Sequence, residues 1–241
     1  MLPEIAQEEL AAAVEDVAAD LLRRQGVRRP PVDALALLKR MGIAVAWDER
    51  QQARARFVRL RRGGTLAGTI LLRPEPRPER LQWAVAHELG EHLSERVFAA
   101  LRVDPVTAPA EAREKIANRL AGAILLPLAW FARDGAAADW ELPALKARYA
   151  TASHELIARR MLDCPPPAIV SIYDQGELTF RGSNVPGRCP RPSEEELLVR
   201  RRAHETGMAA AEGSPDVRAW PIHEPEWRRE IVRAAVSEWE E

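Results

Sequence analysis

Apolar residues recur at helical spacing in the first part of the chain. Over residues 4–26, four of them fall at i, i+4, i+7 and i+11, and they are Leu10, Val14, Val17 and Leu21. This spacing predicts an amphipathic α-helix, and Gly26 follows it as a helix stop. A shorter helix is expected over 30–42, again closed by a glycine, Gly42.

Alternation of apolar and polar residues then replaces the helical period. Residues 43–49 predict a strand, and residues 55–74 predict a β-hairpin that turns at Gly63 and Gly64. Pro78 suits the first turn of the next helix because its missing N–H is not needed there. That helix is expected over about 78–98.

Helical patterns return in the middle of the chain. Residues 108–127 predict a helix that ends at Pro127, and residues 141–162 predict two helices joined by a short turn. The pattern changes again after the prolines of 163–167. We therefore expect an α+β fold with two domains, residues 1–164 and residues 165–241.

The second domain is predicted to be a small α/β module that senses a signal or docks a partner. Residues 168–184 predict two strands joined at Gln175 and Gly176. Ser193 and Glu196 match a capping box at the start of a helix that ends near Gly207. Residues 217–241 predict a strand followed by a terminal helix.

Composition and charge narrow the function only slightly. The chain has 241 residues, 46% of them hydrophobic, and a formal net charge of -1. This balance gives no sign of nucleic-acid or membrane-surface binding. The first ten residues are acidic and lack an apolar core, so we expect no signal peptide. No long apolar segment occurs in the sequence, and its two cysteines form no CxxC pair. We expect a cytoplasmic protein with no membrane association.

The segment "HELGEH" at 87–92 is the strongest chemical signal. It nearly matches the zinc-peptidase signature H-E-x-x-H, but the second His position holds Glu91, and a histidine follows one residue later, at His92. Residues i and i+4 of a helix lie on the same side, so both can reach one ion. Glu88 lies about 100° around the helix from His87, where zinc peptidases place the general base.

Two geometries would complete a metal site. On a regular helix Glu91 is the second ligand, and with His87 and Glu114 it forms a shell of one imidazole and two carboxylates. Such a shell would bind Zn²⁺ but would let Mn²⁺ or Fe²⁺ compete. The alternative is H-E-x-x-x-H, in which a one-residue bulge at Gly90 brings His92 to the ion in place of Glu91. The first is favoured because it needs no distortion, and His92 would then orient Glu88.

Three ordered elements over roughly residues 5–165 resemble the ImmA/IrrE metallopeptidases, which are bacterial zinc-dependent endopeptidases. They are "PPVDALALLKRMGIAVAW", "WAVAHELGEHL" and "EKIANRLAGAILLP". The resemblance implies a zincin-like domain in which Glu114 is the third metal ligand. Residues 142–163 resemble the helix-turn-helix-like stretch of the family. The departure from the family pattern is Glu91.

The resemblance also implies a function. Members of the family cleave DNA-binding repressors that control mobile elements or stress responses, so the expected partner is a repressor. In the expected mechanism the metal activates water and the scissile carbonyl, and Glu88 transfers the proton. Tyr149, His92 and His154 are candidates for stabilising the oxyanion.

Two alternatives remain open. The chain could be a non-catalytic regulator with a peptidase-like fold, or a DNA-binding protein that uses the helices at 142–149 and 153–163. Direct nucleic-acid binding is open, but a near-zero net charge favours packing of these helices on the peptidase. Three other histidines precede a glutamate and are interpreted as solvated helix residues, namely His154, His204 and His223.

Overall fold

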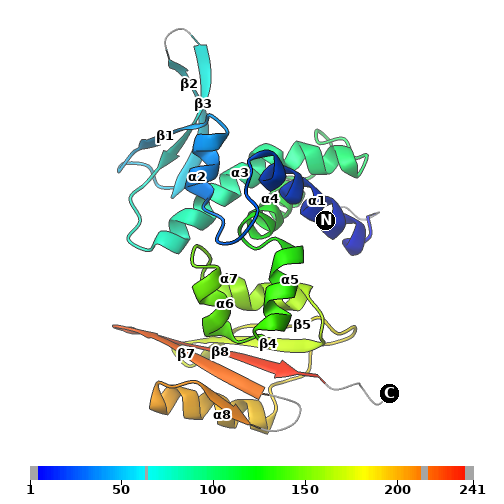
Figure 1. The fold of residues 1–241 in the computed structure, drawn as a ribbon, viewed down its shortest axis with the longest axis vertical. Coiled ribbons are helices and arrows are strands. Elements are labelled where there is room, and N and C mark those ends of the chain that lie inside the picture. Colours follow the sequence, from blue (N-terminus) through cyan, green and yellow to red (C-terminus); the bar gives the residue numbers. More distant parts are fainter. Residues whose placement is uncertain (1–4, 63–64, 213–216, 237–241) are drawn as a thin grey trace. The chain divides into compact units, whose positions relative to one another are not determined.

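The computed structural model describes residues 5–62, 65–212 and 217–236 (Figure 1). The chain divides into two compact units. The first comprises Met1–Phe131 and Ala147–Ser153, and the second comprises Ala132–Lys146 and His154–Glu241. The division at residue 164 was expected from chain composition, and it stays a prediction.

The first unit combines helices with a small sheet. Its elements in chain order are α1 (Gln7–Arg24), α2 (Ala34–Arg40), β1 (Ala44–Trp47), β2 (Ala55–Arg62), β3 (Thr65–Leu72), α3 (Pro78–Ala100) and α4 (Ala110–Leu125). Helix α1 buries the predicted apolar face and packs against α3 and α4. The predicted amphipathic helix is therefore confirmed.

The sheet of the first unit has the order β1-β3-β2. Strand β2 is antiparallel to β3, and β1 is parallel to β3. The predicted hairpin is confirmed, while its turn at Gly63 and Gly64 lies outside the described residues. Strand β2 is at the edge of the sheet and contacts α3, the helix that carries the "HELGEH" segment.

Helices α3 and α4 pack closely because of one glycine. A Cβ atom added to Gly90 would lie 2.4 Å from the backbone oxygen of Ala117. Only a residue without a side chain permits this approach, in which the backbone of α4 lies directly against α3. The contact brings the side chains of the first turns of α4 next to His87.

The second unit is built on a five-stranded antiparallel sheet in the order β5-β4-β8-β7-β6. Its elements are α7 (His154–Arg160), η1 (Met161–Asp163), β4 (Ala168–Asp174), β5 (Glu177–Ser183), α8 (Glu194–Thr206), β6 (Ala210–Glu212), β7 (Val217–Glu224) and β8 (Trp227–Ala235). Helices α5 (Leu128–Ala137) and α6 (Leu142–Arg148) contain residues of both units.

Helix α8 covers one face of this sheet (Figure 1). The residues that form the core between them are Ile169, Tyr173, Val199, Ala203, Val217, Ala219, Val232 and Ala234. The helix begins with the predicted capping box of Ser193 and Glu196 and ends at Gly207, whose φ is 67°. The predicted hairpin of β4 and β5 is also confirmed, with Gln175 and Gly176 at its turn.

The predicted terminal helix is wrong over the described residues, because β7 and β8 form a hairpin instead. Strand β8 lies between β4 and β7, so residues 230–234 are buried on both faces of the sheet. A strand buried on both faces shows no alternation. Two of its buried residues, Glu230 and Arg233, are charged and look in the sequence like the polar face of a helix.

Among the described residues, no single helix is long and apolar enough to span a membrane. Helices α4 and α5 meet the criteria of length and hydropathy together, as a pair bent by 51°.

Candidate metal centre

Three of the predicted ligands meet in the first unit. His87 and Glu91 lie one turn apart on α3, and Glu114 lies on α4. The Nε2 atom of His87 is 3.6 Å from Oε1 of Glu91 and 3.7 Å from Oε2 of Glu114. One donor atom of each residue lies within 4.8 Å of the other two.

Asn118 determines which nitrogen of His87 is available. Its Nδ2 donates to Glu114 Oε1 at 2.9 Å, so its Oδ1 is the atom that faces His87 Nδ1, at 3.1 Å. Because an amide oxygen only accepts, Nδ1 of His87 carries the proton. Nε2 is the ring nitrogen that faces the two carboxylates.

This donor set fits a divalent metal. One imidazole nitrogen and two carboxylate oxygens that lie within reach of one another are donors that a divalent cation can bind together. In a tetrahedral zinc site with bonds of about 2.0–2.2 Å, the ligand atoms are roughly 3.3–3.6 Å apart, close to the observed separations. The carboxylates of Glu91 and Glu114 are more than half exposed, so the site opens to solvent. A hydrogen-bonded partner on the far nitrogen of a histidine is typical of metal ligands.

Glu88 is held differently from the ligands. It is largely buried, and its Oε2 accepts a hydrogen bond of 2.6 Å from the backbone N–H of Phe57 on β2. Burial raises the pKa of Glu88, and the charge of Glu91 adds to this effect. The hydrogen bond from Phe57 and the charges of His87 and Arg56 act on the pKa in the opposite direction.

His92 does not join the group around His87. Helix α3 is a regular α-helix through this segment, without the bulge that H-E-x-x-x-H requires. His92 is exposed, and its ring stacks on that of Phe57 with centroids 5.2 Å apart and planes at 19°. The expectation that Glu91 is the ligand, and not His92, stays a prediction that this geometry favours.

A pocket lies beside the centre. It has a volume of about 310 Å³ and is lined by Glu91, Ser94, Glu95, Phe98, Pro105 and Arg113. Glu91 thus belongs both to the candidate ligand set and to the wall of a cavity that is large enough for a few side-chain atoms.

The other predicted site residues are spread over both units. Tyr149 is fully buried in the first unit, with its ring edge-on to Phe131 at 5.4 Å. His154 is the first residue of α7, in the second unit. Their roles in stabilising an oxyanion stay predictions, as does that of His92.

The arginines of the helix-turn-helix-like stretch contact residues of their own unit. Arg159 pairs with Glu155 at 2.9 Å, and its guanidinium lies over the ring of Phe180. Arg160 pairs with Asp163 at 2.8 Å. The expected packing of the two helices on the peptidase and direct DNA binding both stay untested.

Two contributors to the centre were missed in the sequence. Asn118 stands one helical turn after Glu114, a spacing that allows contact between their side chains, but only the structure connects it to His87. The backbone N–H of Phe57 carries no side-chain signal. Both residues are 31 positions away from their partners on α3.

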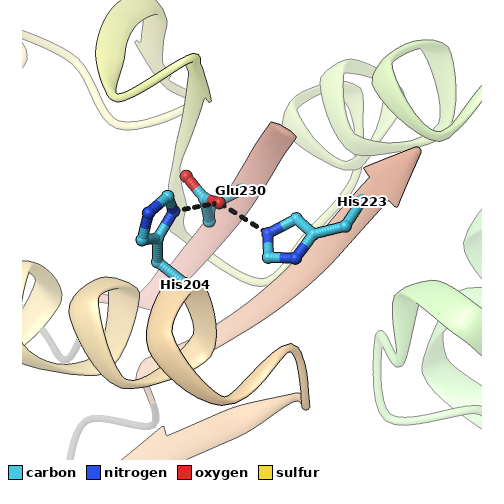
Figure 2. Close-up of side chains that lie close together, drawn as sticks. All are labelled: His204, His223 and Glu230. Carbon is cyan, nitrogen blue, oxygen red and sulfur yellow. Dashed lines mark hydrogen bonds and ion pairs between the residues drawn. The ribbon is translucent and has the colours of Figure 1, made fainter. Parts of the chain in front are cut away.

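A second group of possible ligands was also missed. His204, His223 and Glu230 come together in the second unit (Figure 2). His223 lies on strand β7, so its interpretation as a solvated helix residue is wrong.

The chain is similar to a known protein family and to solved structures. The family model described as Peptidase_M78, IrrE N-terminal-like domain, matches residues 38–161, a range that contains the whole candidate centre. The fold is similar to that of a chain described as a Mycobacterium tuberculosis transcriptional regulator, with a TM-score of 0.60 and 18% sequence identity, covering 92% of this chain and 75% of that chain. At this identity the likeness concerns the fold alone. A comparison with curated proteins gives no match.

Proposed function

The chain belongs to the Peptidase_M78 family, that of the IrrE N-terminal-like domain, and from this premise we propose that it is a zinc-dependent endopeptidase. One observation carries the proposal. Nε2 of His87 lies 3.6 and 3.7 Å from the carboxylates of Glu91 and Glu114, in an arrangement that a divalent cation would complete. A metal bound there would polarise the scissile carbonyl and lower the pKa of water.

Glu88 is the proposed general base. Glu88 lies next to the ligands on α3. The N–H of Phe57 binds its Oε2, so Oε1 would be the atom that accepts a proton from water. It would then deliver that proton to the leaving amine. The raised pKa suits this exchange because the protonated state becomes easier to reach during the reaction.

The ligand chemistry makes zinc the proposed metal but not the exclusive one. One imidazole and two carboxylates form a harder donor set than two imidazoles and one carboxylate, so Mn²⁺ or Fe²⁺ would compete better. Asn118 would orient His87 and favour its basic Nε2.

The proposed substrate is a DNA-binding regulatory protein. This part of the proposal is supported by the resemblance of the "HELGEH" and "EKIANRLAGAILLP" segments to the ImmA/IrrE peptidases. The pocket beside Glu91 would accommodate a side chain of the substrate next to the centre.

A non-catalytic regulator is the second candidate. Glu91 stands where the family pattern has histidine, and this departure is the observation that favours it. Such a protein would keep the metal, or lose it, and act by binding a protein or DNA.

The variant Glu88→Gln separates the two candidates. Gln keeps an oxygen that accepts from Phe57 but cannot take up a proton, so we expect unchanged metal content and proteolysis lowered by about 10²–10⁴-fold. Wild type and variant would each be incubated with a cell extract, and new protein N-termini would be labelled and identified. Metal content would be measured on the same samples.

New N-termini that require Glu88 would support the peptidase and identify its substrate. A chain that binds metal but produces the same N-termini in both samples would support the regulator.

A further inference from the structure

We propose that the second unit holds its own binding site for a divalent transition-metal ion, formed by His204, His223 and Glu230. His204 lies in the last turn of α8, His223 on β7 and Glu230 on β8. One donor atom from each lies within 4.8 Å of the other two (Figure 2). All three residues belong to one compact unit, and none belongs to the centre around His87.

The strand register places two of these residues on the same face of the sheet. Pro221 pairs with Glu230 and His223 pairs with Arg228, so His223 and Glu230 are diagonal neighbours. This face is the one that α8 covers, and it continues the core that contains Ala203. Helix α8 then adds His204 one residue after Ala203.

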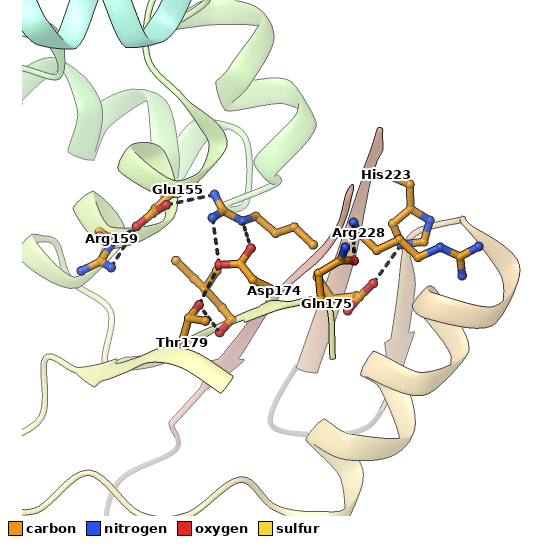
Figure 3. Close-up of polar contacts among 10 residues, drawn as sticks. Glu155, Arg159, Asp174, Gln175, Thr179, His223 and Arg228 are labelled. Atoms are coloured by element: carbon orange, nitrogen blue, oxygen red, sulfur yellow. Dashed lines mark hydrogen bonds and ion pairs between the residues drawn. The ribbon is translucent and has the colours of Figure 1, made fainter. Parts of the chain in front are cut away.

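The β7–β8 turn beside His223 is tied to β4, and the end of α8 lies near the imidazole. Gln175 accepts from the N–H of Arg228 at 3.1 Å and donates to the carbonyl of Glu226 at 3.0 Å, which ties down the β7–β8 turn (Figure 3). A Cβ added to Gly207 would lie 3.9 Å from Nδ1 of His223. The end of α8 therefore passes close to the imidazole.

Glu230 is the residue that points to a ligand. Its side chain is fully buried, and Oε1 accepts from His204 Nδ1 at 2.8 Å and from His223 Nε2 at 2.9 Å. Among the described residues Oε2 has no hydrogen-bond partner, and the nearest cation, Arg200, is 3.9 Å away. A buried carboxylate with an unsatisfied oxygen is costly, and a divalent cation bound to Oε1 between the two imidazoles would compensate its charge.

The donor types indicate which cation. Two imidazoles and one carboxylate suit Zn²⁺, Fe²⁺ and related ions, and not Ca²⁺ or Mg²⁺, which prefer oxygen. The two N···O distances are about 0.5 Å shorter than the edge of a zinc tetrahedron, so the imidazoles would have to move outward slightly. They have room to do so, since His204 and His223 are 35% and 24% exposed. The bound ion would link the end of α8 to the β7–β8 hairpin.

The test uses zinc binding by the full chain with the first centre removed. In a His87→Ala background, we expect one tight equivalent of Zn²⁺ in competition with a chromogenic chelator. Adding His223→Gln or His204→Asn should abolish it. These amides keep a hydrogen-bond donor in the position of Nε2 and Nδ1, respectively, but are poor ligands for zinc. Folding of each variant would be checked by circular dichroism.

Matched controls and a second readout complete the design. His154→Ala and Glu205→Gln change a histidine and an acid of the same unit outside the cluster, and they should keep the equivalent of zinc. Zinc should raise the melting temperature in the His87→Ala background but not when His223→Gln is added, because an ion that binds only the folded state stabilises it.

Two results would overturn the proposal. One is a folded His87→Ala variant that binds no zinc and whose melting temperature zinc leaves unchanged, in which case the cluster is a hydrogen-bonded group only. The other is zinc that persists in both amide variants. Neither result depends on whether the chain is a peptidase, because the first centre is absent throughout.

Discussion

Glu91 and His92 are neighbours on α3, but only Glu91 faces His87. On a regular helix the side chain at i+4 returns to the same side, and the one at i+5 has turned away. The ring of His92 lies instead against Phe57, the residue whose N–H holds Glu88. His92 is therefore linked to the proposed general base, Glu88, only through Phe57.

This geometry predicts a rank order of zinc affinity. Glu91→Ala removes a proposed ligand and should weaken binding the most. Asn118→Ala removes only the partner of His87, which typically costs about 10–100-fold. His92→Ala should have the smallest effect. A competition titration with a zinc chelator, in a His223→Gln background, measures all three.

The variant Glu91→His is the substitution in the same titration that is expected to keep zinc binding. It should be tolerated and should shift the preference toward zinc, since it restores two imidazoles and one carboxylate. If His92→Ala loses the metal while Glu91→Ala keeps it, the helix is bulged in solution and the ligand is His92.

At the scale of elements, an ion-pair network joins β4, β8 and α7. Asp174 lies opposite Arg229 in the sheet, and Arg229 also reaches Glu155 of α7 at 2.9 Å. Thr179 donates to Asp174 at 2.8 Å (Figure 3). Burial alone would raise the pKa of Asp174, but the hydrogen bonds from Arg229 and Thr179 outweigh it and hold the pKa below its ordinary value.

The lowered pKa predicts how the stability contributed by Asp174 depends on pH. A carboxyl group whose folded pKa is depressed stabilises the protein above its unfolded pKa of about 3.9 and loses this contribution as pH falls through the folded pKa. Asp174→Asn should therefore reduce the free energy of unfolding by about 1–3 kcal/mol at pH 7. The difference from wild type should shrink below pH of about 4.

Urea unfolding of wild type and variant at neutral and acidic pH measures this difference. Glu212→Gln is the matched control, because Glu212 pairs with Arg202 at 3.2 Å and both side chains are exposed, where ion pairs contribute little. A difference that is as large at acidic pH as at neutral pH would contradict the assignment.

Local patterns predicted the elements that have one exposed and one buried face. Helix α1 carries such a signal, and the β2–β3 hairpin and α8 carry further local signals, a Gly-Gly turn and a capping box. Strand β8 does not, because it is buried on both faces and contains Glu230 and Arg233. The candidate centre divides in the same way. The i, i+4 relation of His87 and Glu91 is visible in the sequence, whereas the contacts of Asn118 and Phe57 arise only from folding.

At the scale of the molecule, the two units each contain a complete candidate site. The donors around His87 belong to the first unit, and those around Glu230 belong to the second. The second unit also contains the ion pair of Arg181 and Glu196. That pair is buried and bidentate, with N···O distances of 2.6 and 2.9 Å. Removing one partner of such a pair typically costs about 3–5 kcal/mol.

Arg181→Met should therefore destabilise the second unit and leave zinc affinity at the His87 centre unchanged. Effects at sites without shared partners usually add. Thermal unfolding and chelator competition would be measured on the same protein in a His223→Gln background, with Arg188→Met as an exposed control. A loss of zinc affinity in Arg181→Met alone would show that the centre depends on the second unit.

The contact between Gly90 and Ala117 has a consequence for motion. Where two helix backbones touch without side chains between them, neither helix can open by one turn without separating the pair. Amide hydrogens on both sides of this contact should then exchange with solvent only through opening of the whole unit, and so among the slowest in the chain. The exposed side chains of Glu91 and Glu114 would then move while the backbones of α3 and α4 stay rigid.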